Sequence, residues 1–376
     1  MEFHVKNRKR AIVAMSGGVD SSVTAALLKE QGYEVIGVTM KLWNYDDIGG
    51  VNRESGCCSI DTVHDARVVC HQLDAPHYVW DLSEEFGKAV IDNFVHEYLE
   101  GRTPNPCVMC NRHIKWGTFL AKAVSMGADV VATGHYARVT TDGSGLHSLR
   151  KSTNLNKDQS YALWGIRQKA LAMTLFPVGD MTKEEVRAFA EKLGLRTAKK
   201  KESQEICFIT DNDYGRFLRD RIPGLGQDLS GGLVKTVDGA VVGTHDGYAF
   251  YTIGQRRGVG VALNRPIYVT GIDRSTNVVY VGDRETLYAP GLIATDVNLI
   301  RRDLIAGSHR VDAKIRYNDP GHPAELTLRG DDVRICFDEP QCAITPGQSV
   351  VFYKNDEVLG GGIIDRVITH TAEAIS

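Results

Sequence analysis

One short segment near the start of the chain, residues 16–22, constrains the fold more than any other. It reads Ser-Gly-Gly-Val-Asp-Ser-Ser and directly follows the apolar run 11–15. An apolar run, a glycine turn and a hydroxyl-rich start of an amphipathic stretch predict a β-strand, a loop and an α-helix. In that geometry backbone N–H groups and the positive helix end face an anion, and the glycines let a phosphate approach closely. The segment therefore predicts a phosphate-binding loop.

The spacing of this loop separates it from a common nucleotide-binding motif. The Walker pattern G-x-x-x-x-G-K-[ST] is absent from the sequence. The pattern S-G-G-x-D-S instead resembles the PP-loop of ATP pyrophosphatases, which cleave ATP between its α and β phosphates. The alternative interpretation is a plain glycine-rich turn between a strand and a helix.

Length and composition define the broad class of the protein. The chain has 376 residues, enough for two or three domains, and its hydrophobic (43%) and charged (24%) fractions are ordinary for a globular protein. The formal net charge of −3 gives no overall attraction to nucleic acid, so RNA contacts must come from local basic clusters. No apolar stretch approaches the length of a membrane span, and no leader pattern precedes the loop. We therefore expect a cytosolic protein.

The pattern of predicted elements changes near the middle of the chain. From residue 11 to about 135, short apolar runs alternate with amphipathic stretches. This alternation predicts an α/β domain with a doubly wound parallel sheet, which binds ligands at the carboxyl ends of its strands. The predicted strands are 11–15, 34–40, 77–82 and 129–133, and the predicted helices are 22–31, 61–73, 83–100, 112–126 and 183–193.

Beyond about residue 210, short alternating runs separated by turn signals predict β structure. We therefore expect three domains. They are an α/β domain over 1–213, a small mainly β domain over 214–287 and a β-barrel or sandwich over 288–376.

Eight cysteines in a chain of this size and compartment argue against a disulfide framework. Cys110 falls at or just before the predicted start of a helix, and Cys207 follows the basic run 199–201; both settings favour a thiolate. A zinc site formed by Cys107, Cys110 and residues 57–58 is an alternative, but adjacent cysteines seldom bind the same zinc ion. Unrelated core cysteines are the other alternative.

Several motifs together carry a resemblance to one family. Through these motifs, the chain resembles the bacterial tRNA-uridine 2-sulfurtransferases over nearly its full length. The motifs are MSGGVDSS (15–22), TPNP (103–106) with Cys110-Asn111, ATGHYAR (132–138), KDQSY (157–161), SQEICFI (203–209), GTHDG (243–247), YTIGQRRG (251–258) and PGQSVVF (346–352).

The resemblance implies a fold and an activity. The fold would be a PP-loop ATP pyrophosphatase domain, a small central adaptor domain and a C-terminal β-barrel. The activity would be ATP-dependent 2-thiolation of the wobble uridine of tRNA. ATP and Mg²⁺ would be the cofactors, with no metal ligands identified in the protein. The partners would be tRNA and a cysteine desulfurase or sulfur-relay protein, and the protein would be a monomer.

The resemblance also assigns roles to single residues. Cys110 would be the nucleophile and Cys207 the persulfide carrier. ATP would be bound by Ala14, Met15, Ser16, Gly17, Gly18, Val19, Asp20, Ser21, Met40 and Gly134. The target base would face Asn105, Pro106 and Cys107, and other parts of tRNA would contact His135, Lys157, Asp158, Gln159, Arg316, Tyr317 and Gln348.

One position departs from the family pattern. The family commonly has an aspartate where this chain has Cys107. A thiol is a weaker acid than a carboxyl group, so it is not a fixed anion at neutral pH. If the aspartate accepts a proton during activation, the acceptor here is the Cys107 thiolate, Asp158 or a water molecule.

The chemistry of uracil explains why ATP would be needed. The 2-oxygen of uracil is a poor leaving group, and adenylation converts it into AMP, which is a good one. Cys110 could then release hydrosulfide from a Cys207 persulfide, or the persulfide could attack C2 directly. Two rival functions are an amide-forming PP-loop synthetase, which would leave both cysteines unexplained, and a non-catalytic RNA-binding protein.

Overall fold

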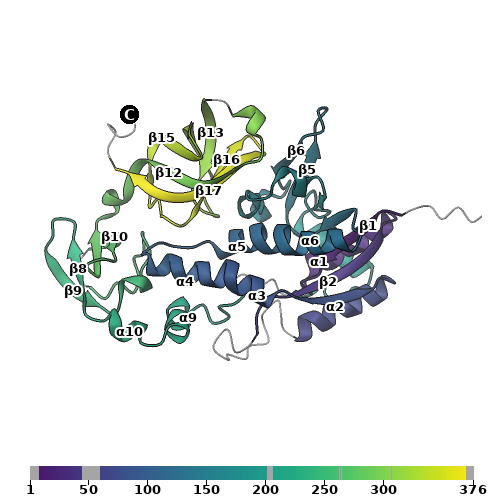
Figure 1. The fold of residues 1–376 in the computed structure, drawn as a ribbon, viewed down its shortest axis with the longest axis horizontal. Coiled ribbons are helices and arrows are strands. Elements are labelled where there is room, and N and C mark those ends of the chain that lie inside the picture. Colours follow the sequence, from purple (N-terminus) through teal and green to yellow (C-terminus); the bar gives the residue numbers. More distant parts are fainter. Residues whose placement is uncertain are drawn as a thin grey trace, which may run out of the picture. The chain divides into compact units, whose positions relative to one another are not determined.

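The computed structural model of the chain describes residues 8–44, 60–200, 206–261, 263, 265–305 and 307–369. The chain divides into two compact units, and Figure 1 colours them along the sequence. None of the described helices has the length and apolar character that a membrane span requires. The first unit comprises Met1–Ala89, Cys107–Asn212 and Asp356–Val358, and the second comprises Val90–Pro106, Asp213–Asn355 and Leu359–Ser376.

A five-stranded parallel sheet is the centre of the first unit. Its strands run in the order β3-β2-β1-β4-β7, and every neighbouring pair is parallel. The chain moves outward from β1 to β3 and then continues on the other side of β1, so the strand order reverses between β1 and β4. Sheets of this kind bind ligands at that reversal. The strands are β1 (Arg10–Ala14), β2 (Glu34–Lys41), β3 (His77–Asp81), β4 (Val130–Ala132) and β7 (Thr174–Leu175).

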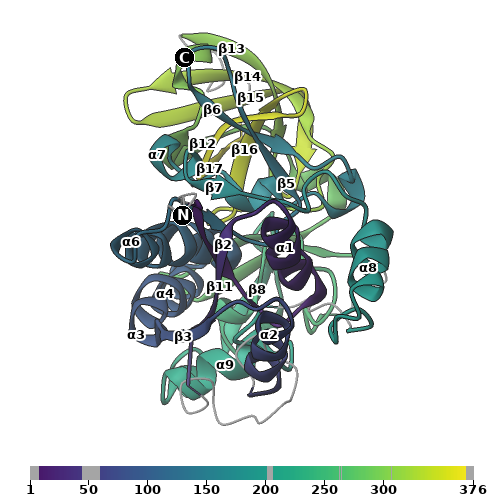
Figure 2. The same cartoon turned by 90° about the vertical axis from the view of Figure 1, so that its right-hand side faces the viewer.

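Helices cover this sheet on both faces. Figure 2 shows α1 and α2 on one side of β1 and β2, and α6 on the other. Apolar side chains of α1, α2 and α8 form one core with β1, which includes Val13, Val23, Val69 and Val186. The predicted doubly wound α/β fold is therefore confirmed. These helices are α1 (Val19–Glu30), α2 (Ile60–Gln72), α6 (Leu120–Ser125) and α8 (Lys183–Lys192), and a short helix α7 (Gln168–Leu171) follows β6 (His147–Lys151) along the chain.

The helix that carries Cys110 begins earlier than its sequence pattern predicts. The predicted range is 112–126, but helical structure starts at Pro106 and continues to Ser125 through α5 (Pro106–Met109), the π-helical stretch η3 (Cys110–Phe119) and α6. Proline is favoured at the first position of a helix, because its missing N–H has no partner there in any case. The prediction that Cys110 lies at or just before a helix N-terminus is therefore wrong: it lies one turn inside.

A second long helix matches its prediction. The predicted helix 83–100 is present as α3 (Ser83–Phe86), the π-helical stretch η2 (Gly87–Ile91) and α4 (Asp92–Leu99). It ends before Gly101, whose φ of 71° is the left-handed conformation that glycine adopts readily after a helix.

A β-hairpin that is absent from the predicted strands completes the first unit. It consists of β5 (Ala137–Thr141) and β6, which pair in antiparallel fashion. The first residues of β17, Glu357 and Val358, pair with Arg150 and Leu149 of β6. This pairing is why the short segment Asp356–Val358 belongs to the first unit.

The second unit contains a four-stranded sheet and a closed six-stranded barrel. The four-stranded sheet has the order β10-β11-β8-β9 and buries Val234, Val269 and Val279. In the barrel β12 pairs with both β15 and β17, so the sheet closes on itself. The sequence allowed a barrel or a sandwich, and the barrel is present. The strands are β8 (Gly232–Thr236), β9 (Val241–His245), β10 (Tyr268–Asp273), β11 (Val278–Gly282), β12 (Tyr288–Leu299), β13 (Ser308–Lys314), β14 (His322–Arg329), β15 (Asp332–Cys342), β16 (Ser349–Lys354) and β17 (Glu357–Ile368), with helices α9 (Tyr214–Arg221) and α10 (Leu225–Asp228) before them.

Candidate active site

The predicted phosphate-binding loop joins β1 to α1 at the carboxyl end of the central strand. Gly17 has a φ of 67°, and a Cβ at this position would lie 2.3 Å from the backbone oxygen of Thr62 in α2. Only glycine therefore fits here. Gly18 is the extended residue before α1. The first N–H groups of α1, which have no partner within the helix, follow it directly. Ser16 is exposed and Gly18 is half-buried, so solutes can reach the loop.

The serine hydroxyl groups of this segment shape the loop. Ser21 Oγ accepts a hydrogen bond from Ser16 N (3.3 Å) and donates one to Gly18 O (3.1 Å). Ser22 Oγ also donates to Gly18 O, at 2.8 Å. Both side chains are almost fully buried. These bonds hold the backbone of the loop in place, and one of them uses the N–H group of Ser16.

Ala14, Met40 and Gly134 lie at the carboxyl ends of neighbouring strands. Ala14 is the last residue of β1, Met40 is next to last in β2, and Gly134 follows β4 by two residues. A Cβ on Gly134 would lie 2.7 Å from backbone atoms of Asp20 and Ser21, so the end of β4 touches the first turn of α1. The three residues therefore share one edge of the sheet, whereas their contact with ATP stays a prediction.

Asp20 in the first turn of α1 has two partners that sequence reasoning missed. Its carboxylate accepts hydrogen bonds from Lys183 Nζ at 2.8 and 2.9 Å, and from the Tyr136 hydroxyl at 2.7 Å. Lys183 is 163 residues away in the sequence. No local pattern indicates this pair, although Tyr136 lies inside the motif ATGHYAR (132–138).

His135 connects the end of β4 with the helix that carries Cys110. Its Nε2 lies 3.3 Å from Lys115 Nζ, and its Nδ1 lies 2.6 Å from Thr133 Oγ1. Burial, and to a lesser degree the Lys115 ammonium, hold the pKa of His135 well below its usual value. The ring is therefore neutral at pH 7. An ammonium can only donate, so Nε2 accepts from Lys115 and Nδ1 donates to Thr133.

Cys110 is the first residue of the π-helical stretch η3. Its side chain is 9% exposed, whereas Cys107, in the first turn of the same helix, is exposed. Asn111 Nδ2 donates to Ala162 O at 2.8 Å, and this bond holds the helix next to the segment after β6. π-Helical turns occur often at functional sites, because they rotate side chains relative to a regular helix.

Cys207 is followed directly by a buried aromatic residue, Phe208. Phe208 is fully buried and meets Phe86 edge-to-face with ring centroids 5.8 Å apart, while Cys207 itself is half-buried. Residues 201–205 fall outside the described residues, as do the cysteines at 57–58 of the zinc alternative. Among the residues that the structure describes, no three metal-binding side chains form a cluster.

The basic run 199–201 is partly held by an ion pair. Lys200 Nζ lies 2.6 Å from Asp65 Oδ2, and Arg196 Nε lies 2.8 Å from Asp65 Oδ1. Arg187 of α8 donates to the backbone oxygens of Ala198 and Lys200. The start of the segment before Cys207 is therefore fastened to α2 and α8.

Asp158 and Gln159, predicted to contact tRNA, support a loop of the first unit. Asp158 accepts from Ser152 N (2.9 Å) and from Ser160 Oγ (2.7 Å). Gln159 exchanges two hydrogen bonds with the backbone of Tyr136, at 2.8 and 2.9 Å. Lys157 is half-buried in the same loop. Through Gln159, this loop is connected to Tyr136, whose hydroxyl group donates to Asp20.

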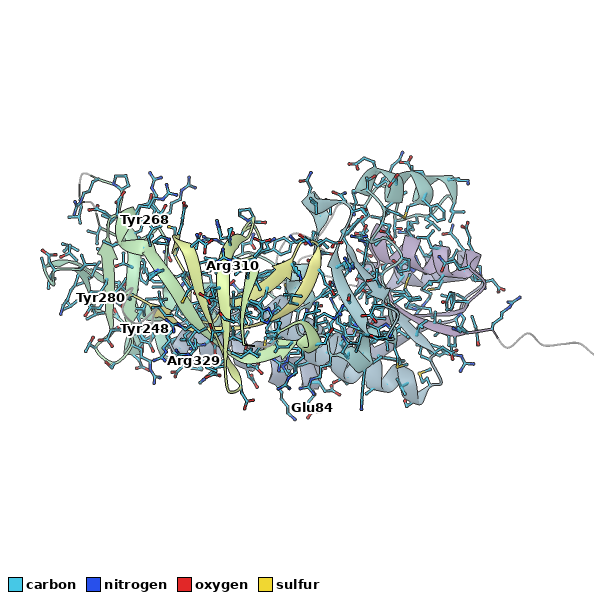
Figure 3. All side chains as sticks on the ribbon, turned by 90° about the horizontal axis from the view of Figure 1, so that it is seen from above. Glu84, Tyr248, Tyr268, Tyr280, Arg310 and Arg329 are labelled. Carbon is cyan, nitrogen blue, oxygen red and sulfur yellow. The ribbon has the colours of Figure 1, made fainter. Side chains whose placement is uncertain are left out.

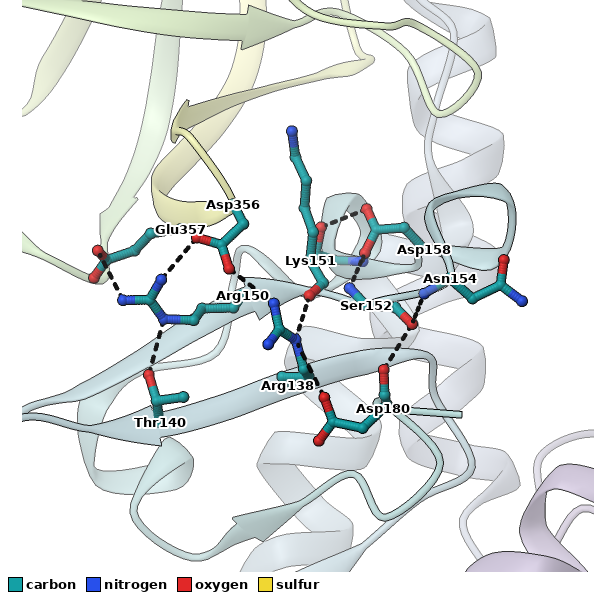
Figure 4. A network of polar contacts seen from close by, with 12 residues as sticks. Arg138, Thr140, Arg150, Lys151, Ser152, Asn154, Asp158, Asp180, Asp356 and Glu357 are labelled. Atoms are coloured by element: carbon teal, nitrogen blue, oxygen red, sulfur yellow. Dashed lines mark hydrogen bonds and ion pairs between the residues drawn. The ribbon is translucent and has the colours of Figure 1, made fainter. Parts of the chain in front are cut away.

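A group of arginines and carboxylates lies beside this loop (Figure 4). Asp356 accepts from Arg138 at 2.8 Å and from Arg150 at 2.7 Å. Arg138 also donates from Nε to Lys151 O, and Ser148 donates to Glu357 at 2.5 Å. The network fastens the start of β17 to the β5–β6 hairpin.

The remaining predicted tRNA contacts belong to the second unit. Gln348 Nε2 donates to Thr103 O (3.1 Å) and Pro104 O (2.9 Å), which fixes the backbone just before Asn105. Arg316 donates to Cys342 O at 2.9 Å, and Tyr317 is 46% exposed. Arg316 and Tyr317 are accessible on the barrel, as a tRNA contact would require. Asn105 is half-buried and Pro106 is buried.

Three protein-family models match the chain in succession. They are described as tRNA methyl transferase HUP domain (residues 9–211), tRNA methyl transferase PRC-barrel domain (217–283) and Aminomethyltransferase beta-barrel domain (289–364). Together they cover most of the chain, and the first alone covers more than half of it.

Relatives from several bacteria match nearly the full length of the chain, and each is named tRNA-specific 2-thiouridylase MnmA. The relative from Salinibacter ruber is 51% identical over 372 residues, 96% of this chain and 96% of its own length. Those from Geobacter metallireducens (52% over 367 residues, 97% and 99%) and Carboxydothermus hydrogenoformans (51% over 365 residues, 96% and 99%) are equally similar.

Proposed function

Because the chain belongs to the family of the tRNA-specific 2-thiouridylases MnmA, we propose that it converts the wobble uridine of tRNA to 2-thiouridine. ATP activates the uracil 2-oxygen by adenylation, and AMP and pyrophosphate leave. The single observation that carries the proposal is identity of about one residue in two with these relatives over nearly the whole chain. The accessible glycine loop at the strand-order reversal supports it independently.

ATP binds at the loop with its phosphates facing the backbone N–H groups of residues 17–21, because the N–H group of Ser16 donates to Ser21 Oγ. The close contact between Gly134 and the first turn of α1 supports a role for Gly134 in the same site. Mg²⁺ commonly binds to substrate phosphates and few protein carboxylates. The donor set fits that mode, because the carboxylate of Asp20 already accepts from Lys183 and Tyr136. Mg²⁺ would therefore be held mainly by the ATP phosphates, and it would neutralise part of their charge.

A chain of contacts in the first unit supports Cys110 as the nucleophile near this loop. Cys110 and Lys115 share the stretch η3, Lys115 contacts His135, and the neighbouring Gly134 touches Asp20. Cys110 and Cys207 are both thiols in the structure. A persulfide on Cys207 supplies the sulfur, and a cysteine desulfurase or a sulfur-relay protein delivers it.

Two routes can transfer the sulfur from the Cys207 persulfide to C2 of the uridine. In the first, the Cys110 thiolate attacks Sγ of the Cys207 persulfide, which forms a Cys110–Cys207 disulfide and releases hydrosulfide. Hydrosulfide then attacks C2 of the adenylated uridine and AMP leaves. In the second, the terminal persulfide sulfur attacks C2 first and AMP leaves. The Cys110 thiolate then attacks Sγ of Cys207, which forms the Cys110–Cys207 disulfide and leaves the terminal sulfur on C2. Both routes end in the same disulfide, which an external thiol must reduce before the next turnover.

Cys107 takes the place of the family aspartate. It is exposed in the first turn of a helix, where the helix dipole favours a thiolate. Asp158, the other candidate base, accepts hydrogen bonds from Ser152 and Ser160. We therefore assign proton acceptance to Cys107. Replacing Cys107 with Asp, the family residue, should preserve activity, whereas Cys107→Ala should lower it.

We propose that the barrel contacts tRNA through Arg316 and Tyr317 and that the protein acts as a monomer. Its three domains would be 1–213, 214–287 and 288–376. The ranges of the matching models support this division. Deleting the barrel would also remove Asp356–Val358 from the first unit, so point variants test tRNA contact better. Arg316→Gln should weaken tRNA binding and reduce its salt dependence. Arg329→Gln, at an exposed position of the same barrel (Figure 3), is the matched control.

Reconstitution tests the whole proposal. Full-length protein is incubated with wobble-uridine tRNA, ATP, Mg²⁺, a persulfide donor and a thiol reductant, and tRNA nucleosides are identified by mass spectrometry. We expect 2-thiouridine and AMP in equal amounts. A methylated nucleoside instead would favour the reaction named in the family-model descriptions. AMP release that depends on a small carboxylic acid and ignores tRNA would favour an amide-forming synthetase, and tRNA binding without AMP would favour an RNA-binding protein.

A further inference from the structure

The proposed phosphate-binding loop carries a negative charge of its own. Residues 14–22 contain one charged side chain, Asp20, and no cation. Like charges at close range repel, and the repulsion grows where water is excluded. A loop that accepts the phosphates of ATP therefore needs a cation from elsewhere to balance Asp20.

Lys183 of α8 is placed to supply this charge. Its Nζ lies 2.8 Å from Asp20 Oδ1 and 2.9 Å from Oδ2, so it bridges both carboxylate oxygens. The Tyr136 hydroxyl donates to Oδ1 at 2.7 Å, and the Tyr136 ring lies 5.7 Å from the ammonium. The side chain of Lys183 is 8% exposed and that of Asp20 is 29% exposed. Water therefore screens this pair less than a surface pair.

The position of Lys183 is unfavourable for the helix that carries it. It is the first residue of α8, where the helix dipole disfavours a cation, and its burial removes most of the hydration of the ammonium. The start of α8 is already satisfied by the capping box of Thr182 and Glu185. Residues that oppose local structural preferences are expected at functional sites.

We propose that Lys183 is a positioning residue of the ATP site that cancels the charge of Asp20. Together with Tyr136 it fixes the carboxylate beside the first turn of α1, so that the triphosphate of ATP meets a loop without net negative charge. This inference rests on the proposed function, because it takes the loop as the ATP site. The ligand class is a nucleoside triphosphate, recognised through its phosphates.

Calorimetric titration of the full-length protein with Mg²⁺-ATP and with adenosine tests the inference. Lys183→Met should weaken ATP binding at least about tenfold and change adenosine binding less than about twofold. Lys192→Met, an exposed position in the last turn of α8, is the matched control and should bind like the wild type. Lys183→Arg keeps the charge and should bind ATP within about threefold of the wild type.

A double variant separates charge balance from direct phosphate contact. If Lys183 acts by cancelling Asp20, then Lys183→Met combined with Asp20→Asn should bind ATP within about threefold of Asp20→Asn alone. Failure of this rescue would overturn the inference, since Lys183 would then contact the phosphates itself. Unchanged ATP binding by Lys183→Met, or loss with Lys183→Arg equal to that with Lys183→Met, would also overturn it. A wild-type protein that binds no ATP would instead refute the proposed function.

Discussion

Gly134→Ala is the substitution that most directly links the fold to the proposed ATP site. Gly134 follows β4, and a Cβ there would lie 2.7 Å from Asp20 C and Ser21 N and 2.9 Å from Asp20 Cβ. Carbon atoms in favourable contact are about 3.5–4.0 Å apart. The first turn of α1 must therefore move by roughly 1 Å relative to β4 to accept the methyl group. Backbone atoms of a helix cannot rotate away as the end of a flexible side chain can.

The expected penalty follows from this geometry. Overpacking of this kind typically lowers the free energy of unfolding by about 1–3 kcal/mol. The displaced atoms include Ser21 N, and the Ser21 side chain bonds the loop at Ser16 and Gly18. We therefore expect ATP binding to weaken by about tenfold or more, which corresponds to about 1.4 kcal/mol. tRNA binding should change little.

Urea unfolding and ATP titration measure the two effects separately. Gly143→Ala is the matched control, because Gly143 lies in the turn of the β5–β6 hairpin and a Cβ there meets no atom within 4 Å. Its unfolding free energy should stay within about 0.5 kcal/mol of the wild type. If Gly134→Ala matches that control in both stability and ATP affinity, the close approach of β4 to the loop is not part of the site.

Other variants test single steps. Asp20→Ala should abolish AMP release and leave tRNA binding nearly intact in a filter-binding assay; unchanged AMP production would remove Asp20 from the site. Cys207→Ser should fail to accept persulfide sulfur, whereas Cys110→Ser should accept it, seen by intact-mass analysis, and make no 2-thiouridine. Thiolation by Cys207→Ser with a desulfurase as sole donor would reassign the carrier. The folded pKa of His135 lies below its usual value of 6.5, so the unfolded state binds the proton more readily. The contribution of His135 to the free energy of unfolding should therefore be complete above about pH 6.5 and decrease as the pH drops below it. His135→Gln should reduce this decrease in urea unfolding measured at several pH values. An unaltered slope would exclude His135 as its source.

Local features of the structure were predictable because local chemistry determines them. The capping box of Thr182 and Glu185 is present with both hydrogen bonds, and α8 ends before Gly194, whose φ is 64°. β1 and the glycine loop also follow directly from an apolar run and a turn. α1 begins at Val19, three residues before the predicted start, because the turn closes at Gly18.

Features that depend on distant residues could not be read from the sequence. Lys183 and Asp20 are 163 positions apart, and nothing near either residue indicates the pair. The pairing of Asp356 with Arg138 and Arg150 likewise requires the tertiary fold. The start of the Cys110 helix differs from the predicted range 112–126 for another reason, because Pro106 is the first residue of the helix and a proline is compatible with that position.

The central claim is that this protein places sulfur on the wobble uridine of tRNA. Mass spectrometry of tRNA nucleosides from cells that lack the protein tests it directly, with wild-type and Cys110→Ser complementation side by side. We expect 2-thiouridine at the wobble position to disappear without the protein, return with the wild-type chain and remain absent with Cys110→Ser. Wobble 2-thiouridine that persists in cells without the protein, at the level seen with it, would contradict the account.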